Sequence, residues 1–411
     1  MRPVFSLFRT GPALMGAVGL TALVACEARR QPEHTTPPAA DSAATVAAPA
    51  PAAPPPDTVD ASRTEHGYQP GHDTTFYIGQ QRYRLLLRAE TDSTKPLVAV
   101  TEGIVGPYYA DDTTTFARTH RVRGYAGGQT ITLLDPAGRQ VFRRQLRKAD
   151  FYQVAGQDIA TVSNPERPLF VGYHAPSQTL AFTVVVGIPD SDVWRTCVLT
   201  LGLDGRVRSL SAGRWSGGEG PDCQAKLLAD GTLLDCEALR RPDGRTVQLL
   251  KPQATLVAAL LLSDSTLCTI YRYGQYREIV NADSTRDYEW VVDRRRRNAP
   301  NAFVLNTRGQ VRQQFRYAGY FDVLGYLVPR RYVWQTHSYY LLDEERGLHV
   351  LDKHNPASVA AVPFQQMQRF RQPQRPEEVR FVITTETATL AFYVDPAQPT
   401  RLRYQRIEPR N

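Results

Sequence analysis

The sequence predicts an all-β body, and three observations carry that prediction. Runs rich in Val, Thr, Tyr, Phe and Leu recur from about residue 74 to the C-terminus, and such runs favour strands. Asp-Gly pairs separate them at Asp204, Asp230 and Asp243, and this dipeptide predicts tight two-residue hairpins because both residues tolerate positive φ. Helical periodicity is nearly absent, since its best candidate, Pro363–Phe370, is long enough for only about two turns.

A secretory signal precedes that body. Residues 1–10 carry two arginines and no acidic residue, and the apolar run Gly11–Ala25 follows. A positively charged start and a short apolar core are typical of a signal peptide. The run is shorter than the roughly 20 residues that a transmembrane helix needs. We therefore expect residues 1–25 to be a signal peptide.

The signal ends in Leu23-Val24-Ala25-Cys26, which resembles the bacterial lipobox. The resemblance implies cleavage after Ala25, a diacylglycerol on Cys26 and a lipid-anchored protein of the bacterial cell envelope. The periplasmic face and the surface face both stay open. Each methylene buried in a bilayer contributes ~0.8 kcal/mol, so several acyl chains hold a soluble domain where one does not. An ordinary secreted protein, whose signal merely ends near a cysteine, is the alternative.

A stretch that cannot bury a core follows the anchor. Of the 23 residues from Thr35 to Asp57, 16 are Pro or Ala and none is aromatic, a composition typical of disorder. Repeated proline favours extended polyproline II, which acts as a semi-rigid spacer. We expect the lipidated cysteine and a disordered spacer over residues 26–73 and the all-β body over 74–411, with a sub-boundary near 215–220 left open.

The strands of the body form an irregular repeat. Units of three or four antiparallel strands are expected at Ala225–Leu250, Tyr332–Val362 and Val379–Ile407. Units of this size are what a β-propeller requires. The individual strands expected elsewhere from the pattern include Thr179–Ile188, Thr196–Leu201, Thr255–Leu262 and Ala302–Asn306.

Two strings in the second half carry a resemblance to known folds. LLADGTLLDCEAL, from Leu227, and YYLLDEERGLHVLDKHN, from Tyr339, resemble strand–turn–strand pieces of WD40-like and six-bladed, TolB-like propellers. The resemblance covers about residues 220–411 and implies a β-propeller of about six blades. Residues 74–215 would then supply further blades. In the alternative they form a β-sandwich, and a smaller β domain follows.

The charge pattern excludes a nucleic-acid reader. The formal net charge is +8, but arginine is spread along the whole body with acids interspersed, whereas such proteins concentrate basic residues on one element. The one dense run, Arg294–Arg297, follows Asp293 and precedes a proline, so we expect a solvated loop. Contact with anionic lipid headgroups or polysaccharide is the alternative for that run.

Four further cysteines predict disulfides, because an even number is usual outside the cytoplasm. Three pairings are open, and Cys223 with Cys236 is the candidate pair, since both flank Asp230-Gly231. A tight hairpin would make the two diagonal neighbours about 7–8 Å apart, which is too far for a bridge without a bulge. Buried free thiols therefore stay open, and the spacing lacks the CxxC of a zinc site. The four are Cys197, Cys223, Cys236 and Cys268.

No motif for catalysis, a metal or a cofactor emerges, and none of these is expected. His66 and His72 have a spacing that a metal site could use, but they adjoin the spacer and are expected in a solvated loop. His349 and His354 belong to a hairpin, where polar surface is expected. Ser216 lies in a glycine-rich loop without the GxSxG spacing of a nucleophile elbow. The acid pairs point to opposite faces if they lie on strands, and we expect them in turns; they are Asp111-Asp112, Glu344-Glu345 and Glu377-Glu378.

Aromatic residues are dense between residues 271 and 340. They could line a carbohydrate or peptide groove, but tyrosine is also a good strand residue whose hydroxyl lies at the rim of a sheet. We expect the second arrangement. The set is Tyr271, Tyr273, Tyr276, Tyr317, Tyr320, Phe321, Tyr326, Tyr332, Trp334, Tyr339 and Tyr340.

These observations predict a membrane-anchored binding or scaffolding module without chemistry of its own. Its expected partners are the membrane, through the lipid on Cys26, and a protein or glycan of the envelope. The alternative is a propeller-type hydrolase or lyase acting on glycans, whose titratable groups would come from several blades. A third option is an assembly factor that pairs its edge strands with another membrane protein.

Overall fold

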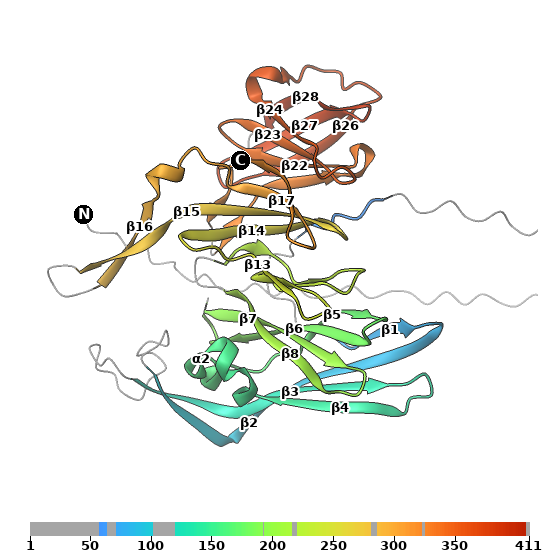
Figure 1. Cartoon of the computed structure of the whole chain (residues 1–411), viewed down its shortest axis with the longest axis vertical. Helices are drawn as coiled ribbons and strands as arrows, with labels where there is room; N and C mark the ends of the chain where they lie inside the picture. The colour runs from blue at the N-terminus through green and yellow to red at the C-terminus, as the bar shows by residue number, and fades with distance from the viewer. Residues whose placement is uncertain are drawn as a thin grey trace, which may run out of the picture. The chain divides into compact units, whose positions relative to one another are not determined.

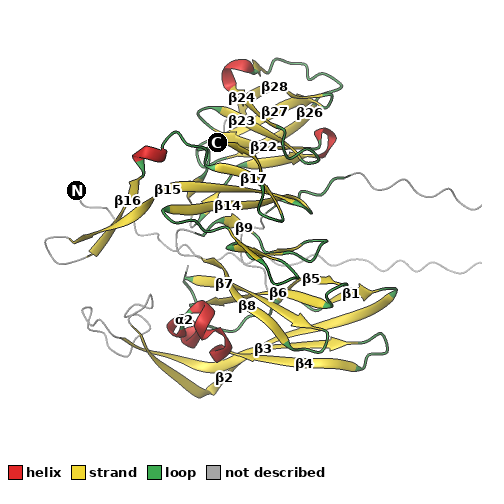
Figure 2. Ribbon diagram, in the orientation of Figure 1, coloured by secondary structure: helices red, strands yellow, loops and turns green. Residues whose placement is uncertain are grey.

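The computed structural model describes residues 57–63, 71–101, 120–191, 193–215, 220–280, 286–322 and 325–407. The chain divides into Met1–Pro54 and Pro55–Asn411, and every described residue belongs to the second unit. The predicted signal peptide, with Ala25 at its predicted cleavage site, and the predicted lipidation site Cys26 therefore lie outside the described residues. Strands dominate the described chain (Figure 2), which confirms the all-β prediction. Within the described ranges, no helix is both long and apolar enough to cross a bilayer.

Sheets 1 and 2 are four-stranded antiparallel meanders in which each strand pairs with the next along the chain. Apolar side chains from both sheets, such as Leu87 and Phe182, share one core. Sheet 1 contains β1 (Thr74–Ile78), β2 (Gln81–Thr101), β3 (His120–Leu134) and β4 (Gln140–Arg147). Sheet 2 contains β5 (Leu169–His174), β6 (Thr179–Gly187), β7 (Trp194–Gly202) and β8 (Val207–Trp215).

Sheets 3 and 4 follow in the chain. Sheet 3 is a meander of short strands, whereas sheet 4 has the order β18-β17-β15-β14-β9, with β16 added on β15. Sheet 3 contains β10 (Lys226–Leu227), β11 (Leu233–Leu234), β12 (Ala238–Arg240) and β13 (Thr246–Gln248). Sheet 4 contains β9 (Asp222–Cys223), β14 (Ala254–Ser263), β15 (Thr266–Val280), β16 (Arg286–Val292), β17 (Ala302–Asn306) and β18 (Val311–Phe315).

Sheets 5 and 6 complete the described chain and again have four strands each. A two-stranded pair, β19 (Phe321–Asp322) and β20 (Tyr326–Leu327), precedes them. Sheet 5 contains β21 (Arg330–Val333), β22 (Ser338–Asp343), β23 (Gly347–Asp352) and β24 (Val359–Pro363). Sheet 6 contains β25 (Gln368–Arg369), β26 (Val379–Thr384), β27 (Thr389–Asp395) and β28 (Gln398–Ile407).

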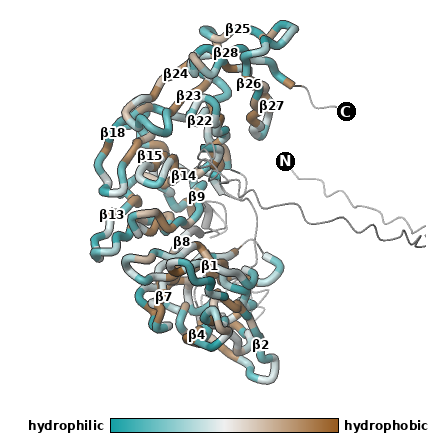
Figure 3. Tube along the Cα trace, turned by 90° about the vertical axis from the view of Figure 1, so that its right-hand side faces the viewer, coloured by the Kyte–Doolittle hydropathy of each residue, from teal (hydrophilic) through white to brown (hydrophobic). Residues whose placement is uncertain are grey.

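Each sheet packs against the next one in chain order (Figure 1). Neighbouring residues on a strand point to opposite faces, so Leu256 joins the core with sheet 3 while Val257 joins the core with sheet 5. Tyr339 and Tyr340 serve the two faces of sheet 5 in the same way. Burial on both faces explains why β14 is continuously hydrophobic from Leu256 to Leu262 rather than alternating. Elsewhere hydrophobic and hydrophilic stretches follow one another along the trace (Figure 3). Within the described residues, no hydrophobic cluster joins sheet 1 to sheet 6, so the structure describes successive sheets rather than a closed ring.

The Asp-Gly turns differ from the predicted type. Gly205, Gly231 and Gly244 have positive φ values of 76°, 80° and 83°, whereas the aspartates before them do not. The amide of Gly231 donates to the carbonyl of Leu228, and the amide of Leu228 donates to Thr232. This is the three-residue loop that ends in a left-handed glycine. Hairpins therefore form at all three Asp-Gly pairs, as predicted, but each closes with a three-residue loop rather than the expected two-residue loop.

The tyrosine prediction also needs correction. Tyr271, Tyr317 and Tyr339 are almost fully buried, so their hydroxyls do not lie at a rim. Instead each hydroxyl donates to a backbone carbonyl of another segment. Tyr271 donates to Leu249 at 2.8 Å, Tyr317 to Leu342 at 2.8 Å and Tyr339 to Leu262 at 2.9 Å. A buried hydroxyl must find such a partner, and here that requirement ties neighbouring sheets together.

Two short helices were not predicted. They are α1 (Tyr152–Ala155) and α2 (Gln157–Val162), which packs against the core of sheets 1 and 2. Neither is long enough to show a helical period in the sequence. Conversely, the helical candidate Pro363–Phe370 is only the 3-10 turn η5 (Phe364–Gln366).

Cys223 and Cys236 form a disulfide with a Cα–Cα distance of 5.7 Å. The diagonal arrangement considered for a tight hairpin is absent, because β10 begins after Cys223, at Lys226, which pairs with Leu234. Cys223 instead belongs to β9, which runs parallel to β14. The other two cysteines of the body, Cys197 and Cys268, are free and buried.

Candidate functional site

The residues directly after the Pro/Ala-rich stretch lie against sheet 5. We call Asp57–Arg63 the leading segment. Its Ser62 hydroxyl accepts a hydrogen bond from Arg330 at 3.0 Å, and its Ala61 amide donates to the Tyr339 hydroxyl at 3.2 Å. The leading segment belongs to the range 26–73 that the sequence assigns to the spacer, whereas here it makes contacts with the body.

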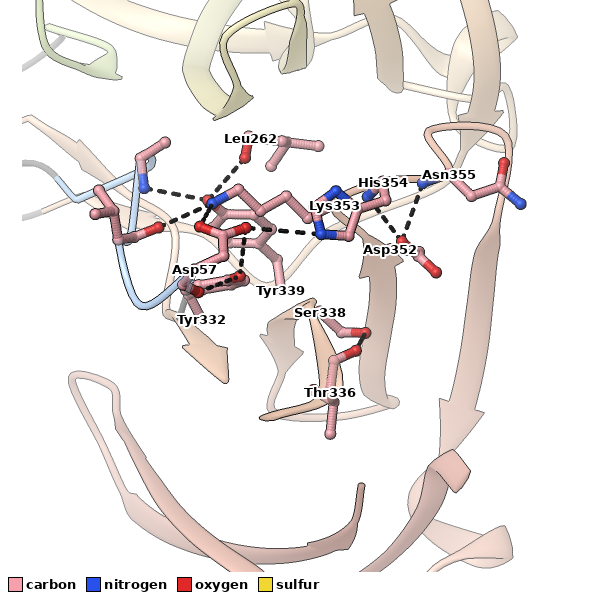
Figure 4. Close-up of polar contacts among 12 residues, drawn as sticks. Asp57, Leu262, Tyr332, Thr336, Ser338, Tyr339, Asp352, Lys353, His354 and Asn355 are labelled. Atoms are coloured by element: carbon pink, nitrogen blue, oxygen red, sulfur yellow. Dashed lines mark hydrogen bonds and ion pairs between the residues drawn. The ribbon is translucent and has the colours of Figure 1, made fainter. Parts of the chain in front are cut away.

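Asp57 contacts Lys353, His354 and Tyr332 (Figure 4). Its Oδ1 atom accepts a hydrogen bond from Lys353 Nζ at 2.7 Å, and its Oδ2 atom lies 3.7 Å from His354 Nε2. The Tyr332 hydroxyl donates to the Asp57 carbonyl at 3.1 Å. The hydrogen bond from Lys353 lowers the pKa of the Asp57 carboxyl below its ordinary value. Asp57 is therefore a carboxylate at neutral pH, with one oxygen engaged by a cation.

Lys353 orients this carboxylate from the turn that follows β23. Its side chain is only 9% exposed, and Nζ lies 4.7 Å from the centre of the Tyr332 ring. Nζ also donates to the carbonyl of Val59 at 3.1 Å. Burial of the phenol, together with the charge of Asp57, raises the pKa of Tyr332. The lysine thus holds both Asp57 and the backbone of the leading segment.

Two histidines complete the cluster. His337 ends the 3-10 turn η4 (Trp334–Thr336) with a left-handed φ of 48°, and its carbonyl accepts a hydrogen bond from the Lys353 amide at 2.8 Å. The His354 amide donates to the Asp352 carboxylate at 2.8 Å, which shapes the turn after β23. The two imidazole rings lie 5.0 Å apart between centroids, and both histidines are exposed.

Asp57, His337 and His354 offer three potential metal ligands at one place. One ligand atom from each lies within 4.8 Å of the other two. A carboxylate with two imidazoles is a donor set that suits zinc and other first-row divalent ions. The sequence predicted no metal site, because these residues lie on three separate segments and share no local motif. Tertiary structure alone brings them together.

A buried ion pair fastens the other end of the leading segment. Arg330 Nη1 donates to Asp222 Oδ2 at 2.5 Å, and neither side chain is more than 8% exposed. The same carboxylate accepts the Val328 amide at 2.8 Å. Arg330 also donates to the Ser62 carbonyl. One guanidinium therefore links the leading segment, β9 and β21.

Other buried acids are held in comparable pairs. Asp235 accepts hydrogen bonds from Arg240, and Glu378 accepts them from Arg403. The first pair lies at sheet 3 and the second at sheet 6, whereas Asp222 with Arg330 joins sheets 4 and 5. These carboxylates are each engaged by an arginine. The titratable groups that the described chain does bring together are Asp57, His337 and His354.

The remaining candidates occupy varied positions. His72 is exposed, whereas His349 is half-buried with its ring 4.8 Å from that of Phe315, rather than on a polar surface as predicted. Arg294–Arg296 form the exposed turn η3, whose cap Asp293 accepts the Arg295 amide at 3.0 Å. Other candidates lie outside the described residues: His66, Asp111-Asp112 and Ser216.

A second candidate site is the ribbon that β15 and β16 form beyond the rest of sheet 4 (Figure 1). Gly274–Val280 pairs there with Arg286–Val292. Val280 is 66% exposed and Val292 is 52% exposed, which is unusual for aliphatic residues on a strand. Within the described residues, β16 pairs only with β15, so its outer edge has no strand beside it.

Comparisons with known proteins add no family. No protein-family model and no curated protein matches the sequence. A solved structure described as a eukaryotic initiation factor is similar over 83% of this chain and 78% of its own, with 11% identity and a TM-score of 0.30. An acylaminoacyl peptidase from Pyrococcus horikoshii is similar over 59% of this chain and 46% of its own, with 13% identity and a TM-score of 0.20. Similarities this low carry no functional argument.

Proposed function

We propose that the chain is a lipid-anchored binding module of the bacterial cell envelope, which recruits a protein partner through the β15–β16 ribbon. In this proposal Ala25 precedes the cleavage site and Cys26 carries the lipid. The Pro/Ala-rich stretch holds the body away from the membrane, and the leading segment joins that stretch to sheet 5.

The body itself is proposed to be propeller-like. Five of the six successive sheets have four strands, and each sheet packs against the next in chain order. That arrangement supports six blades of a β-propeller, in which repeated four-stranded sheets follow one another along the chain. A solution scattering profile of the purified protein tests this. A profile that fits a closed disc supports the ring, and one that fits an elongated series of sheets contradicts it.

The single observation that carries the binding role is the outer edge of β16. An exposed edge offers backbone N–H and C=O groups that can pair with another chain. A two-stranded ribbon is only marginally stable in water, so a third strand would stabilise it. Binding by strand addition uses an extended segment of the partner, whose side chains alternate between the two faces. The exposed Val280 and Val292 then provide apolar contact.

Cross-linking in cells tests the ribbon. A photo-reactive residue in place of Tyr276, which is 40% exposed, should form one defined adduct with an envelope protein. Val292→Lys should abolish the adduct, because an edge lysine opposes strand addition. Val311→Lys is the matched control, since Val311 is 53% exposed and lies on another edge strand, β18. An adduct that persists in Val292→Lys would exclude the ribbon as the binding site.

Metabolic labelling tests the anchor separately. Cells grown with a palmitate analogue should label the wild-type protein and leave Cys26→Ala unlabelled. Fractionation should place the wild type with membranes and the variant in the soluble fraction. Label on Cys26→Ala would reject lipidation at this residue, whatever the outcome of the cross-linking.

A further inference from the structure

We propose that Asp57, His337 and His354 bind one divalent transition-metal ion, with Zn²⁺ the best match, and that the ion joins the leading segment to sheet 5. The proposed binding role does not require this site. Three side chains form it, and metal binding by them does not depend on a lipid anchor.

The ligand atoms are nearly at the separations that a metal imposes. Zinc bonds of about 2.0–2.2 Å to nitrogen and oxygen place the ligand atoms of a tetrahedral site roughly 3.3–3.6 Å apart. Asp57 Oδ2 and His354 Nε2 lie 3.7 Å apart, and all three ligand atoms lie within 4.8 Å of one another. Both imidazoles are exposed, so small side-chain rotations close the remaining gap. A water molecule would take the fourth position on the exposed side.

The backbone around the ligands is already organised. His337 is held in the left-handed conformation at the end of η4. The Lys353 amide donates to the His337 carbonyl, and the Asp352 carboxylate accepts the His354 amide, so both hydrogen bonds shape the turn that bears His354. Lys353 engages Oδ1 of Asp57 at 2.7 Å and leaves Oδ2 on the side of His354. Such outer partners orient the ligands of a metal site and tune its affinity.

The donor set selects among cations. Two imidazoles favour zinc, copper and nickel, whereas calcium and magnesium prefer sets made only of oxygen ligands. The ammonium group of Lys353 next to Asp57 opposes a second positive charge. We therefore expect weaker zinc binding than at a closed structural site, and little binding of Ca²⁺ or Mg²⁺.

Calorimetric titration with ZnCl₂ tests the site. The protein is the full chain with Cys26→Ser, purified in detergent without a histidine tag and stripped with a chelator. His337→Asn and His354→Asn each remove one imidazole, and asparagine tolerates the left-handed backbone of residue 337. His72→Asn is the matched control, because His72 is an exposed histidine outside the cluster. Circular dichroism verifies that every variant is folded.

The expected result is one Zn²⁺ per chain, with an affinity at least about tenfold weaker in each of His337→Asn and His354→Asn. Loss of a residue that only orients a metal ligand already weakens binding by about tenfold, so loss of a ligand should weaken it at least as much. His72→Asn should bind as the wild type does. Co²⁺ as a second probe should show the strong visible absorption of a tetrahedral site only when both histidines are present. Absence of Zn²⁺ binding by the wild type, or unchanged binding by His337→Asn and His354→Asn, would overturn the proposal. Neither result bears on the lipid anchor or on the ribbon.

Discussion

Lys353 Nζ lies 2.7 Å from Asp57 Oδ1, so a turn of sheet 5 holds the leading segment. The lysine side chain is 9% exposed and the aspartate side chain 33% exposed. Such a pair is better protected from solvent than most surface ion pairs, which contribute little. The pair therefore holds Asp57 against the turn that follows β23.

Asp57→Asn should destabilise the protein by about 1–2 kcal/mol at neutral pH. The substitution removes the negative charge that pairs with the Lys353 ammonium group. The partial exposure of Asp57 reduces the cost of this loss. Urea unfolding measures the change, and Thr58→Ala, at an exposed neighbouring residue, serves as the control. Equal stability of Asp57→Asn and Thr58→Ala would show that the pair contributes nothing.

The effect of Asp57→Asn should depend on pH. The hydrogen bond from Lys353 lowers the pKa of Asp57 below its ordinary value of 3.8. A lowered carboxyl pKa means that the stabilisation is complete above the unfolded value and disappears as the pH falls through the folded one. The difference in unfolding free energy between wild type and variant should therefore be constant from about pH 5 to 7, where Asp57 is ionised in both the folded and the unfolded chain. The difference should shrink as the pH falls below about 3.8, the ordinary pKa of the carboxyl. A difference that persists in acid would contradict this assignment.

Arg330→Met should be strongly destabilising, by about 3–5 kcal/mol, because it leaves the buried Asp222 carboxylate without its counter-charge. The double variant Arg330→Met/Asp222→Asn should recover part of the loss. Arg331→Met, at an exposed neighbour, should change stability little. The free energies of unfolding of the three variants decide the matter, and a double variant less stable than Arg330→Met would refute a charge-based explanation.

Tyr339→Phe should cost about 1–3 kcal/mol, since it removes the hydroxyl that donates to the buried Leu262 carbonyl and accepts the Ala61 amide. Tyr77→Phe is the matched control, because Tyr77 is 63% exposed, and it should change stability by no more than about 0.5 kcal/mol. Thermal unfolding of both variants measures the difference. Similar midpoints for the two would mean that the hydroxyl does not tie sheet 5 to sheet 4.

Removing the disulfide with Cys223→Ser/Cys236→Ser should cost about 3 kcal/mol, because the bridge closes a short loop with a sequence separation of 13. Wild-type protein unfolded with reductant should behave as the double variant does. Thiol titration of the unfolded, unreduced body should detect Cys197 and Cys268 and neither of the bridged cysteines. Detection of Cys223 or Cys236 in that titration would argue against the bridge.

The ribbon and the histidine cluster show different limits of sequence reasoning. The ribbon consists of strand-forming residues, yet the pattern does not show that Val292 lies beyond the sheet and is exposed. His337 and His354 lie on separate segments and form no local metal-binding motif. Their proximity to Asp57 depends on where the leading segment docks.

Local chemistry was sufficient to predict most strands of sheets 3, 5 and 6, but not β25, which lies in the segment expected to be helical. The runs of strand-forming residues and the Asp-Gly pairs act over a few residues, so they can be recognised without knowledge of the fold. The turn type, the buried tyrosine hydroxyls and the Cys223–Cys236 geometry depended on register and on the neighbouring sheet. The cluster of Asp57, His337, Lys353 and His354 depended on tertiary structure entirely, because only long-range packing brings a residue beside the spacer against two turns of sheet 5.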